Sequence, residues 1–198
     1  PPNIKEICKH AFELCLELDD VEIPKNPEFT KINKRIFDNT PIKFLLIPNQ
    51  IVEIGKSGLE NCYLLKKVKF EKNSQLRIIG ECAFDATMLF QIKIPVRVNE
   101  IRDCAFLDCK YLKKVIFPAN SELTLIGKFA FARSKIENFS VPPHVKQIGE
   151  NAFSGCENLI IFEINDESEL TLIDRSYFPE RSNALIMVSS KLSKYVKL

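Results

Sequence analysis

The sequence of 198 residues predicts a single domain that is a β-rich solenoid of eight coils. Three observations predict this fold: an internal repeat, a strict alternation of repeat lengths, and a short strand-like segment in every copy. Internal repeats with a period of about 20 to 50 residues are typical of solenoids, in which each unit contacts only its neighbours. A protein of this kind is expected to act through an extended surface and not through an enclosed pocket.

Each copy of the repeat begins at an isoleucine that is followed five residues later by Phe or Leu. The copies begin at Ile7, Ile32, Ile54, Ile79, Ile101, Ile126, Ile148 and Ile173. The spacing between them alternates between 25 and 22 residues, so the true period is 47 residues. The longer units carry an extra turn after the strand, as at residues 72–75 and 119–122, and one more residue before the strand.

The column five residues after the isoleucine predicts a buried aromatic stack along the solenoid axis. It contains Phe12, Phe37, Leu59, Phe84, Phe106, Phe131, Phe153 and Phe178. The residue directly after the isoleucine is Gly, Asn or Asp in six copies, namely Asn33, Gly55, Gly80, Gly127, Gly149 and Asp174. Because these three residue types tolerate a left-handed backbone, we expect a bend with positive φ at this column.

Each copy continues with a segment of the form apolar-x-x-apolar-x-apolar, as in residues 65–70, 112–117 and 136–141. Its β-branched and aromatic residues roughly alternate with polar ones, which predicts a strand in each coil. Proline follows the strand in five copies, at Pro24, Pro48, Pro95, Pro118 and Pro142, and ends it because proline cannot donate to the ladder. Stacked coils would place these strands in a parallel sheet on the concave face.

The combined pattern Ile-Gly-x-x-Ala-Phe-x-x-Cys-x-x-Leu-x-x-Val-x-Phe-Pro resembles the BspA-like class of leucine-rich repeats. Residues 106–112 and 153–159 match it closely, and the resemblance covers about residues 4–190. In the final copy Asp174 replaces Gly and Tyr177 replaces Ala, so we expect an irregular C-terminal cap over about residues 179–198. The resemblance implies a cell-surface or secreted protein that adheres to host matrix proteins or to other cells.

Composition excludes several classes of function. A net charge of +2 is too small to argue for a nucleic-acid partner. No apolar run approaches the roughly 20 residues that a membrane helix needs. The sequence starts within a repeat and without a signal peptide, so we expect it to be a piece of a longer protein. The oligomeric state is not predicted.

No catalytic, cofactor-binding or metal-binding motif is found, so we do not expect an enzyme. The two histidines, His10 and His144, lie more than five coils apart and cannot share a site. Cys8, His10 and Cys15 do not have the ligand spacing of a structural zinc site.

Four of the seven cysteines, Cys15, Cys62, Cys109 and Cys156, are spaced 47 residues apart. Like positions two coils apart are too distant for a disulfide, so we interpret this column as buried and structural. Cys82 and Cys104 occupy equal positions in adjacent coils, and they are either two free thiols or a disulfide.

The outward positions of the strands are the candidate contact surface. The candidate partner-binding residues are Lys43, Phe44, Lys66, Lys67, Lys69, Phe90, Lys93, Lys113, Lys114 and Ile116. They fit an acidic protein partner with aromatic anchors, although exposed lysines also serve to keep sheets soluble. The sequence therefore predicts a non-enzymatic protein-binding module, and the alternative is an intracellular scaffold for protein–protein interaction, which the many cysteines favour.

Overall fold

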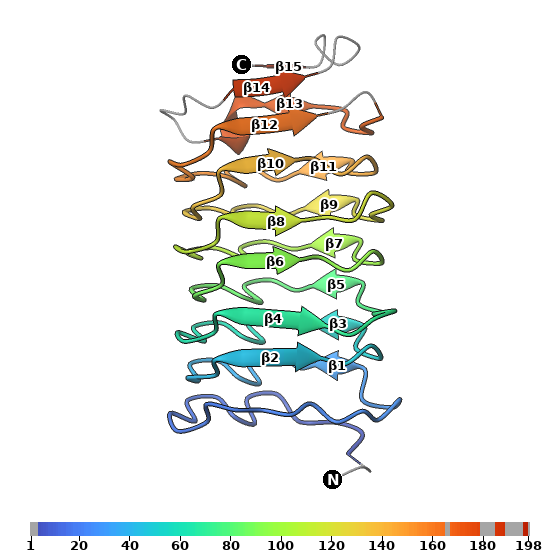
Figure 1. The fold of residues 1–198 in the computed structure, drawn as a ribbon, viewed down its shortest axis with the longest axis vertical. Coiled ribbons are helices and arrows are strands. Elements are labelled where there is room, and N and C mark those ends of the chain that lie inside the picture. The colour runs from blue at the N-terminus through green and yellow to red at the C-terminus, as the bar shows by residue number, and fades with distance from the viewer. Residues whose placement is uncertain (1–3, 165–166, 179–184, 189–195, 198) are drawn as a thin grey trace.

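The computed structural model describes residues 4–164, 167–178, 185–188 and 196–197. Figure 1 shows that the chain winds into coils that lie one above another along the long axis. Apart from one short 3-10 helix, η1 (Arg175–Tyr177), the regular elements of the described residues are strands. The fold is a parallel β-solenoid, which confirms the predicted fold class.

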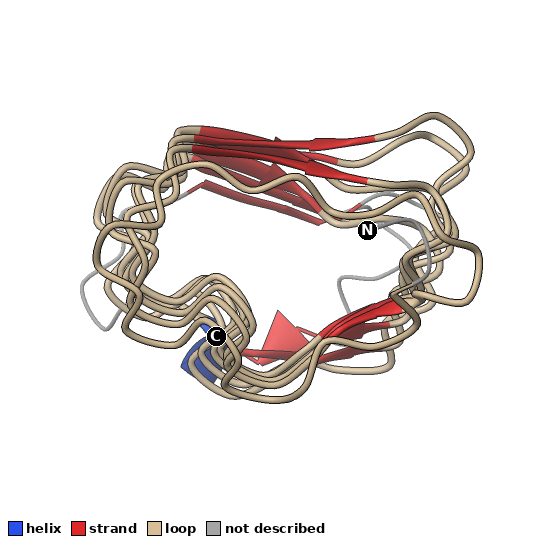
Figure 2. Cartoon of the chain, turned by 90° about the horizontal axis from the view of Figure 1, so that it is seen from below, coloured by secondary structure: helices blue, strands red, loops and turns tan. Residues whose placement is uncertain are grey.

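Two sets of strands lie on opposite walls of each flattened coil (Figure 2). The first set forms a wall that we call the strand face: β2 (Phe44–Ile47), β4 (Lys67–Phe70), β6 (Gln91–Lys93), β8 (Lys114–Ile116), β10 (Asn138–Ser140), β12 (Ile161–Ile164) and β14 (Leu185–Val188). The second set forms the back face: β1 (Lys31–Ile32), β3 (Glu53–Ile54), β5 (Ile78–Ile79), β7 (Glu100–Ile101), β9 (Leu125–Ile126), β11 (Gln147–Ile148), β13 (Ile173–Asp174) and β15 (Val196–Lys197).

The strands of both faces pair in parallel, but only the back face has a long unbroken sheet. Its six strands follow the order β1-β3-β5-β7-β9-β11, and β13 pairs with β15. The strand face is divided into three smaller sheets, β2-β4, β6-β8 and β10-β12-β14. The strand-face strands were predicted by the sequence. The back-face strands were missed, because each has only two residues and lies where a bend was expected.

The number of regular coils is slightly lower than the predicted eight. Six of the eight repeat isoleucines, from Ile32 to Ile148, lie in the six-stranded sheet. The first copy, at Ile7, forms turns without a strand, and the last, at Ile173, lies in the separate pair of β13 and β15. The cap predicted over about residues 179–198 falls largely outside the described residues.

The predicted aromatic stack is confirmed and forms the centre of the core. The rings of Phe84 and Phe106 lie 5.2 Å apart and those of Phe106 and Phe131 lie 5.3 Å apart, nearly parallel in both pairs. Leu59 occupies the same column, is fully buried and interrupts the run of rings. Stacking of like side chains from coil to coil therefore buries one continuous apolar column.

The glycines that follow the isoleucine are required by close packing between coils, and the positive φ predicted for them is wrong. Gly55, Gly80, Gly127 and Gly149 all lack a positive φ. A Cβ atom at Gly127 would lie 2.4 Å from the backbone nitrogen of Asp103 in the preceding coil. The missing side chain therefore lets successive backbones approach each other.

Left-handed backbone occurs instead at the columns three and seven residues after the isoleucine. The first column contains His10, Arg35, Ser57, Cys82, Cys104, Phe129 and Asn151, and the second contains Leu14, Asn39, Asn61, Ala86, Asp108, Arg133 and Gly155. At these positions the amide donates to the next coil, for example from Cys82 to the Asp103 carbonyl at 3.0 Å. This inter-coil bonding offsets the roughly 1–2 kcal/mol that a left-handed non-glycine residue costs.

Candidate functional site

The ten candidate partner-binding residues lie on the strand face, within or directly before β2, β4, β6 and β8. They are Lys43, Phe44, Lys66, Lys67, Lys69, Phe90, Lys93, Lys113, Lys114 and Ile116, of which all except the partly buried Ile116 are exposed. Alternation explains their direction, because successive side chains of a strand point to opposite sides. In β2 and β4 the outward residues alternate with buried Leu45 and Val68.

Two of the lysines are paired with carboxylates from a neighbouring coil. Lys43 Nζ lies 2.7 Å from the Asp19 carboxylate, and Lys113 Nζ lies 3.0 Å from that of Glu137. Over the part of the chain that the structure describes, no ion pair is found for the other five lysines, which are Lys66, Lys67, Lys69, Lys93 and Lys114. The middle of the strand face therefore carries positive charge that is not locally neutralised.

Exposed aromatic rings lie among these lysines. Phe44 is 39% exposed and Phe90 is 55% exposed. The ammonium group of Lys113 lies 5.9 Å from the centroid of the Phe90 ring, at the limit of a cation–π contact. Large exposed rings beside cationic groups are the residue types that anchor protein–protein contacts.

The strand face is hollowed between β4 and β6 into a groove of about 700 Å³. Five of the candidate residues line it, which are Lys66, Lys67, Lys69, Phe90 and Lys93. Val96, which was not among the predicted outward positions, lines it as well. The shape of a groove between two coils depends on the spacing and register of those coils, so the sequence of either coil alone does not predict it.

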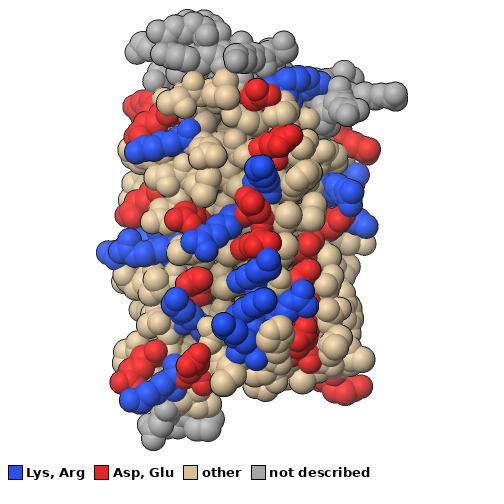
Figure 3. Space-filling model, turned by 180° about the vertical axis from the view of Figure 1, so that it is seen from behind, with Lys and Arg blue, Asp and Glu red and all other residues tan. Residues whose placement is uncertain are grey.

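The back face has a different arrangement of charge. Figure 3 shows basic and acidic side chains interspersed over it. Lys31 of β1 lies 2.9 Å from Glu53 of β3, and Lys56 lies 2.7 Å from Glu81. Because neighbouring charges of opposite sign largely cancel, this face attracts a charged partner less than the strand face does.

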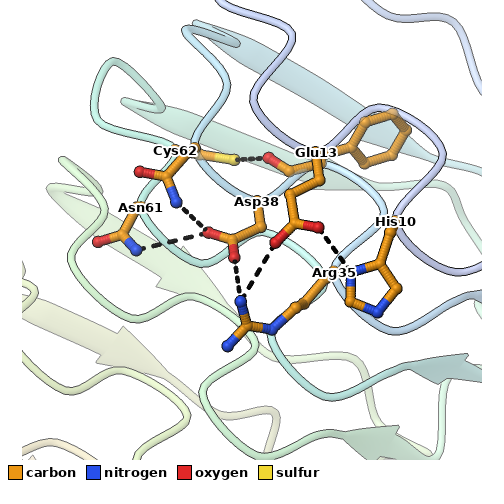
Figure 4. Close-up of polar contacts among 8 residues, drawn as sticks. His10, Glu13, Arg35, Asp38, Asn61 and Cys62 are labelled. Carbon is orange, nitrogen blue, oxygen red and sulfur yellow. Dashed lines mark hydrogen bonds and ion pairs between the residues drawn. The ribbon is translucent and has the colours of Figure 1, made fainter.

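A polar cluster ties the turns of the first three coils together (Figure 4). The guanidinium of Arg35 lies 3.2 Å from the Glu13 carboxylate and 3.3 Å from that of Asp38, and His10 Nδ1 lies 2.6 Å from Glu13. Asp38 is only 1% exposed and accepts a hydrogen bond from the Asn61 amide. Burial raises the pKa of Asp38, whereas the hydrogen bond from His10 lowers the pKa of Glu13. These groups bind one another across coils, which indicates a structural role.

Carboxylates continue along the next coils at the same turns. Burial raises the pKa of Asp85 to about 7, and the negative charges of Glu60 and Asp108 raise it further in the same direction. Asp108 is itself held at 3.1 Å by Arg133. The described residues contain no group of three or more His, Cys, Asp or Glu side chains that could hold a metal ion.

All seven cysteines are free thiols. Cys62, Cys109 and Cys156 are buried, as their column predicts, whereas Cys15 in the first coil is partly exposed. Cys82 and Cys104 are also partly exposed and occupy the same left-handed position in adjacent coils. Burial raises the pKa of the Cys82 thiol to about 12 and also raises that of Cys104.

The two histidines lie in separate small contacts and not in a common site. His10 Nδ1 pairs with Glu13 at 2.6 Å, and His144 Nδ1 pairs with Glu169 at 2.7 Å. They belong to the first and sixth copies of the repeat, so their distance along the solenoid agrees with the sequence analysis.

A family model described as the BspA type leucine rich repeat region matches the chain in six copies, over residues 1–113 and 77–195. Comparison with curated proteins gives no match. Among the residues that the structure describes, no helix is long and apolar enough to cross a membrane.

Solved structures of bacterial proteins are similar to this solenoid. The pneumococcal vaccine antigen PcpA is 26% identical, with 76% of this chain and 42% of that chain covered and a TM-score of 0.64. The leucine-rich repeat protein TpLRR of T. pallidum is 30% identical, with 61% and 57% covered and a TM-score of 0.56. A leucine-rich repeat protein of Bacteroides ovatus, at 19% identity, 91% and 66% coverage and a TM-score of 0.62, shows the fold alone. The chain thus spans about half the length of the first two structures.

Proposed function

The chain belongs to the BspA type leucine-rich repeat family, and on this premise we propose that it is a non-enzymatic protein-binding module of a cell-surface or secreted protein. In this proposal the module contributes to adhesion to host or matrix proteins. The strand face contacts the partner, because solenoids characteristically bind through an extended surface that successive repeats build together.

One observation carries the proposal. Five exposed lysines for which the described part of the chain provides no ion pair lie together with exposed Phe44 and Phe90 on one wall of the solenoid. Lysines whose only role is solubility can form ion pairs with acidic neighbours, as they do on the back face. A role in solubility alone therefore does not require the lysines of the strand face to lack ion pairs. Unneutralised charge beside aromatic anchors supports steering and docking of an acidic protein.

The location outside the cell is supported by one comparison. The similar PcpA structure is described as that of a pneumococcal vaccine antigen. That description concerns the pneumococcal protein, and it supports the cell-surface or secreted location for this chain as part of the proposal.

The test is a binding assay against a panel of purified extracellular matrix proteins by biolayer interferometry. The strand-face variant changes Lys66, Lys67 and Lys114 to Glu. The matched control changes to Glu three exposed lysines that lie off the strand face, Lys9, Lys34 and Lys128. We expect the wild type to bind at least one matrix protein, the strand-face variant to bind roughly tenfold more weakly or worse, and the control to bind like the wild type. If the two variants bound equally well, the strand-face lysines would not contribute to binding. If the wild type bound no matrix protein, adhesion to matrix would be refuted.

The alternative is an intracellular scaffold for protein–protein interaction, and one observation favours it. All seven cysteines are free, as is usual for proteins kept in a reducing compartment. Antibody labelling of intact and permeabilised cells separates the two proposals. Labelling of intact cells, or detection in the culture medium, supports the first, and labelling only after permeabilisation supports the second.

A further inference from the structure

The strand face contains a seam between β4 and β6. On one side of the seam β2 pairs with β4, with Phe44 opposite Lys67. On the other side β6 pairs with β8, with Gln91 opposite Lys114. Within the described residues no backbone hydrogen bond joins β4 to β6. The N–H and C=O groups of a strand point alternately to its two neighbours, so the groups of β4 and β6 that face the seam have no partner in the adjacent strand.

The seam follows the alternation of repeat lengths. β4 begins eight residues after Leu59, whereas β6 begins seven residues after Phe84. From β2 to β10 the strands pair where a longer spacing follows a shorter one and do not pair where a shorter spacing follows a longer one. β12 and β14 are an exception, because they pair although a spacing of seven residues follows one of eight. The same change recurs 47 residues later between β8 and β10, which also do not pair, so the strand face has a second seam there.

The groove over the first seam combines an apolar floor with basic walls. Val68 and Ile94 are buried beneath it, and Phe90 is exposed at one edge. Four lysines without an ion pair in the described chain line its walls, which are Lys66, Lys67, Lys69 and Lys93. The carboxylate that lines it, Glu71, lies 2.6 Å from Lys25 and is thereby neutralised.

The groove over the second seam is the internal comparison. It measures about 430 Å³, and Lys114 is the one lysine in its lining. Ile116 stands at the position equivalent to Lys69, and Ser140 at the position equivalent to Lys93. A groove is therefore present at both seams, but the positive charge is concentrated in the groove between β4 and β6.

From this geometry we infer that the groove between β4 and β6 binds an extended acidic segment of a partner protein. An extended peptide lies over the outer surface of the seam and does not insert between the strands, because Cα atoms of β4 and β6 approach within 8 Å and an inserted strand would need about twice the usual spacing of about 4.8 Å. Its alternate side chains point to opposite sides, so apolar residues meet the floor while acidic residues meet the lysines at the rims. This inference rests on the proposed function, because it specifies the chemistry of the partner at the strand face.

An extended peptide fits these features better than another polyanion does. Phosphate or sulfate groups of a nucleic acid or polysaccharide could also contact lysines, but they would leave the apolar floor without a partner. Binding of a polyanion in place of the peptide is therefore one of the results that the experiment distinguishes.

The experiment measures binding of a fluorescent octapeptide of alternating Asp and Val to the full chain by fluorescence anisotropy. The matched peptide replaces every Asp with Asn, and heparin is the polyanion probe. One protein variant carries Lys67→Glu and Lys69→Glu. The control carries Lys34→Glu and Lys128→Glu, which changes the net charge equally at exposed lysines off the strand face. Thermal melts verify that both variants are folded.

We expect the acidic peptide to bind, the groove variant to lose roughly tenfold or more in affinity, and the control to keep it within about twofold. Binding should weaken with added salt, because the charges are exposed. Hydrogen exchange of the complex should show new protection of amides in β4 and β6. Equal binding of the Asn peptide, equal loss in the control variant, or binding of heparin without binding of the peptide would overturn the inference.

The two proposals fail in different ways. A wild-type protein that binds a matrix protein but not the acidic peptide would refute the groove inference and leave the adhesion proposal standing. A protein that binds the peptide through β4 and β6 but no matrix protein would do the reverse.

Discussion

The thiol of Cys62 donates a hydrogen bond of 3.2 Å to the backbone carbonyl of Phe37 in the preceding coil. The same contact recurs at 3.1 Å one and two periods later, from Cys109 to Phe84 and from Cys156 to Phe131. Burial raises the pKa of Cys109 to about 12, so this thiol remains a protonated donor. Cys62, Cys109 and Cys156 are therefore structural links between coils and not reactive groups.

Replacing Cys109 with Ala is expected to lower the free energy of unfolding by about 1–3 kcal/mol, because it removes a buried contact and leaves a small cavity. Urea unfolding followed by circular dichroism measures the change. Cys8→Ala, at an exposed thiol, is the control and should change stability by less than about 0.5 kcal/mol. Equal effects of the two substitutions would contradict a structural role for the column.

Replacing Gly127 with Ala is expected to destabilise the solenoid by about 3 kcal/mol or more, because the new Cβ would lie 2.4 Å from the Asp103 backbone nitrogen. Gly155 is the comparison, since it has a positive φ of 71° and its added Cβ would meet the flexible Arg133 side chain at 3.1 Å. Gly155→Ala should cost about 1–2 kcal/mol, the cost of a left-handed backbone. A larger loss at Gly155 than at Gly127, measured by the same unfolding assay, would refute the close-approach explanation.

Stability is expected to fall as the pH rises from about 4 to about 7. Burial, with the added charges of Glu60 and Asp108, raises the pKa of Asp85 from 3.8 to about 7. The folded chain therefore holds this proton more tightly than the unfolded chain, and the stability gained from it is lost between about pH 4 and pH 7. Asp85→Asn cannot ionise and should show a flatter dependence of melting temperature on pH. Parallel curves for the two proteins would show that Asp85 does not titrate in this range.

Cys82 and Cys104 are expected to be free thiols that react slowly in the folded protein. Burial raises the pKa of Cys82 to about 12, and the thiolate is the form that an alkylating reagent attacks. Timed iodoacetamide labelling followed by peptide mass spectrometry should modify exposed Cys8 before either of them. After denaturation without reductant, all seven cysteines should be labelled. A chain that lacks two labels at these positions, with a mass lower by two hydrogen atoms, would establish the disulfide instead.

Part of the fold followed directly from residue type. Phe106 could be assigned to the core because the same apolar residue recurs at one offset in successive copies, and identical offsets stack in a solenoid. Gly127 shows where such reasoning fails. A column of small residues indicates either a left-handed backbone or a close approach, and residue type does not distinguish these two causes.

The candidate surface was predicted to a similar extent. Alternation along the strand was enough to place Lys67 and Lys69 on the outside. The ion pairs of these lysines were not predictable, because Lys43 and Lys113 contact carboxylates that lie a full coil away in the sequence. Two lysines with the same local pattern can therefore differ in whether their charge is available to a partner.

The sequence by itself determined the repeat, the buried columns and the outward lysines, because these depend on periodicity within one chain segment. Only the tertiary structure decided which residues adopt a left-handed backbone, which lysines have no ion pair among the described residues, and where the strands of the strand face do not pair, as between β4 and β6. These features arise where two coils meet. Hydrogen bonding and ion pairing act over a few ångströms, so they depend on the register between coils.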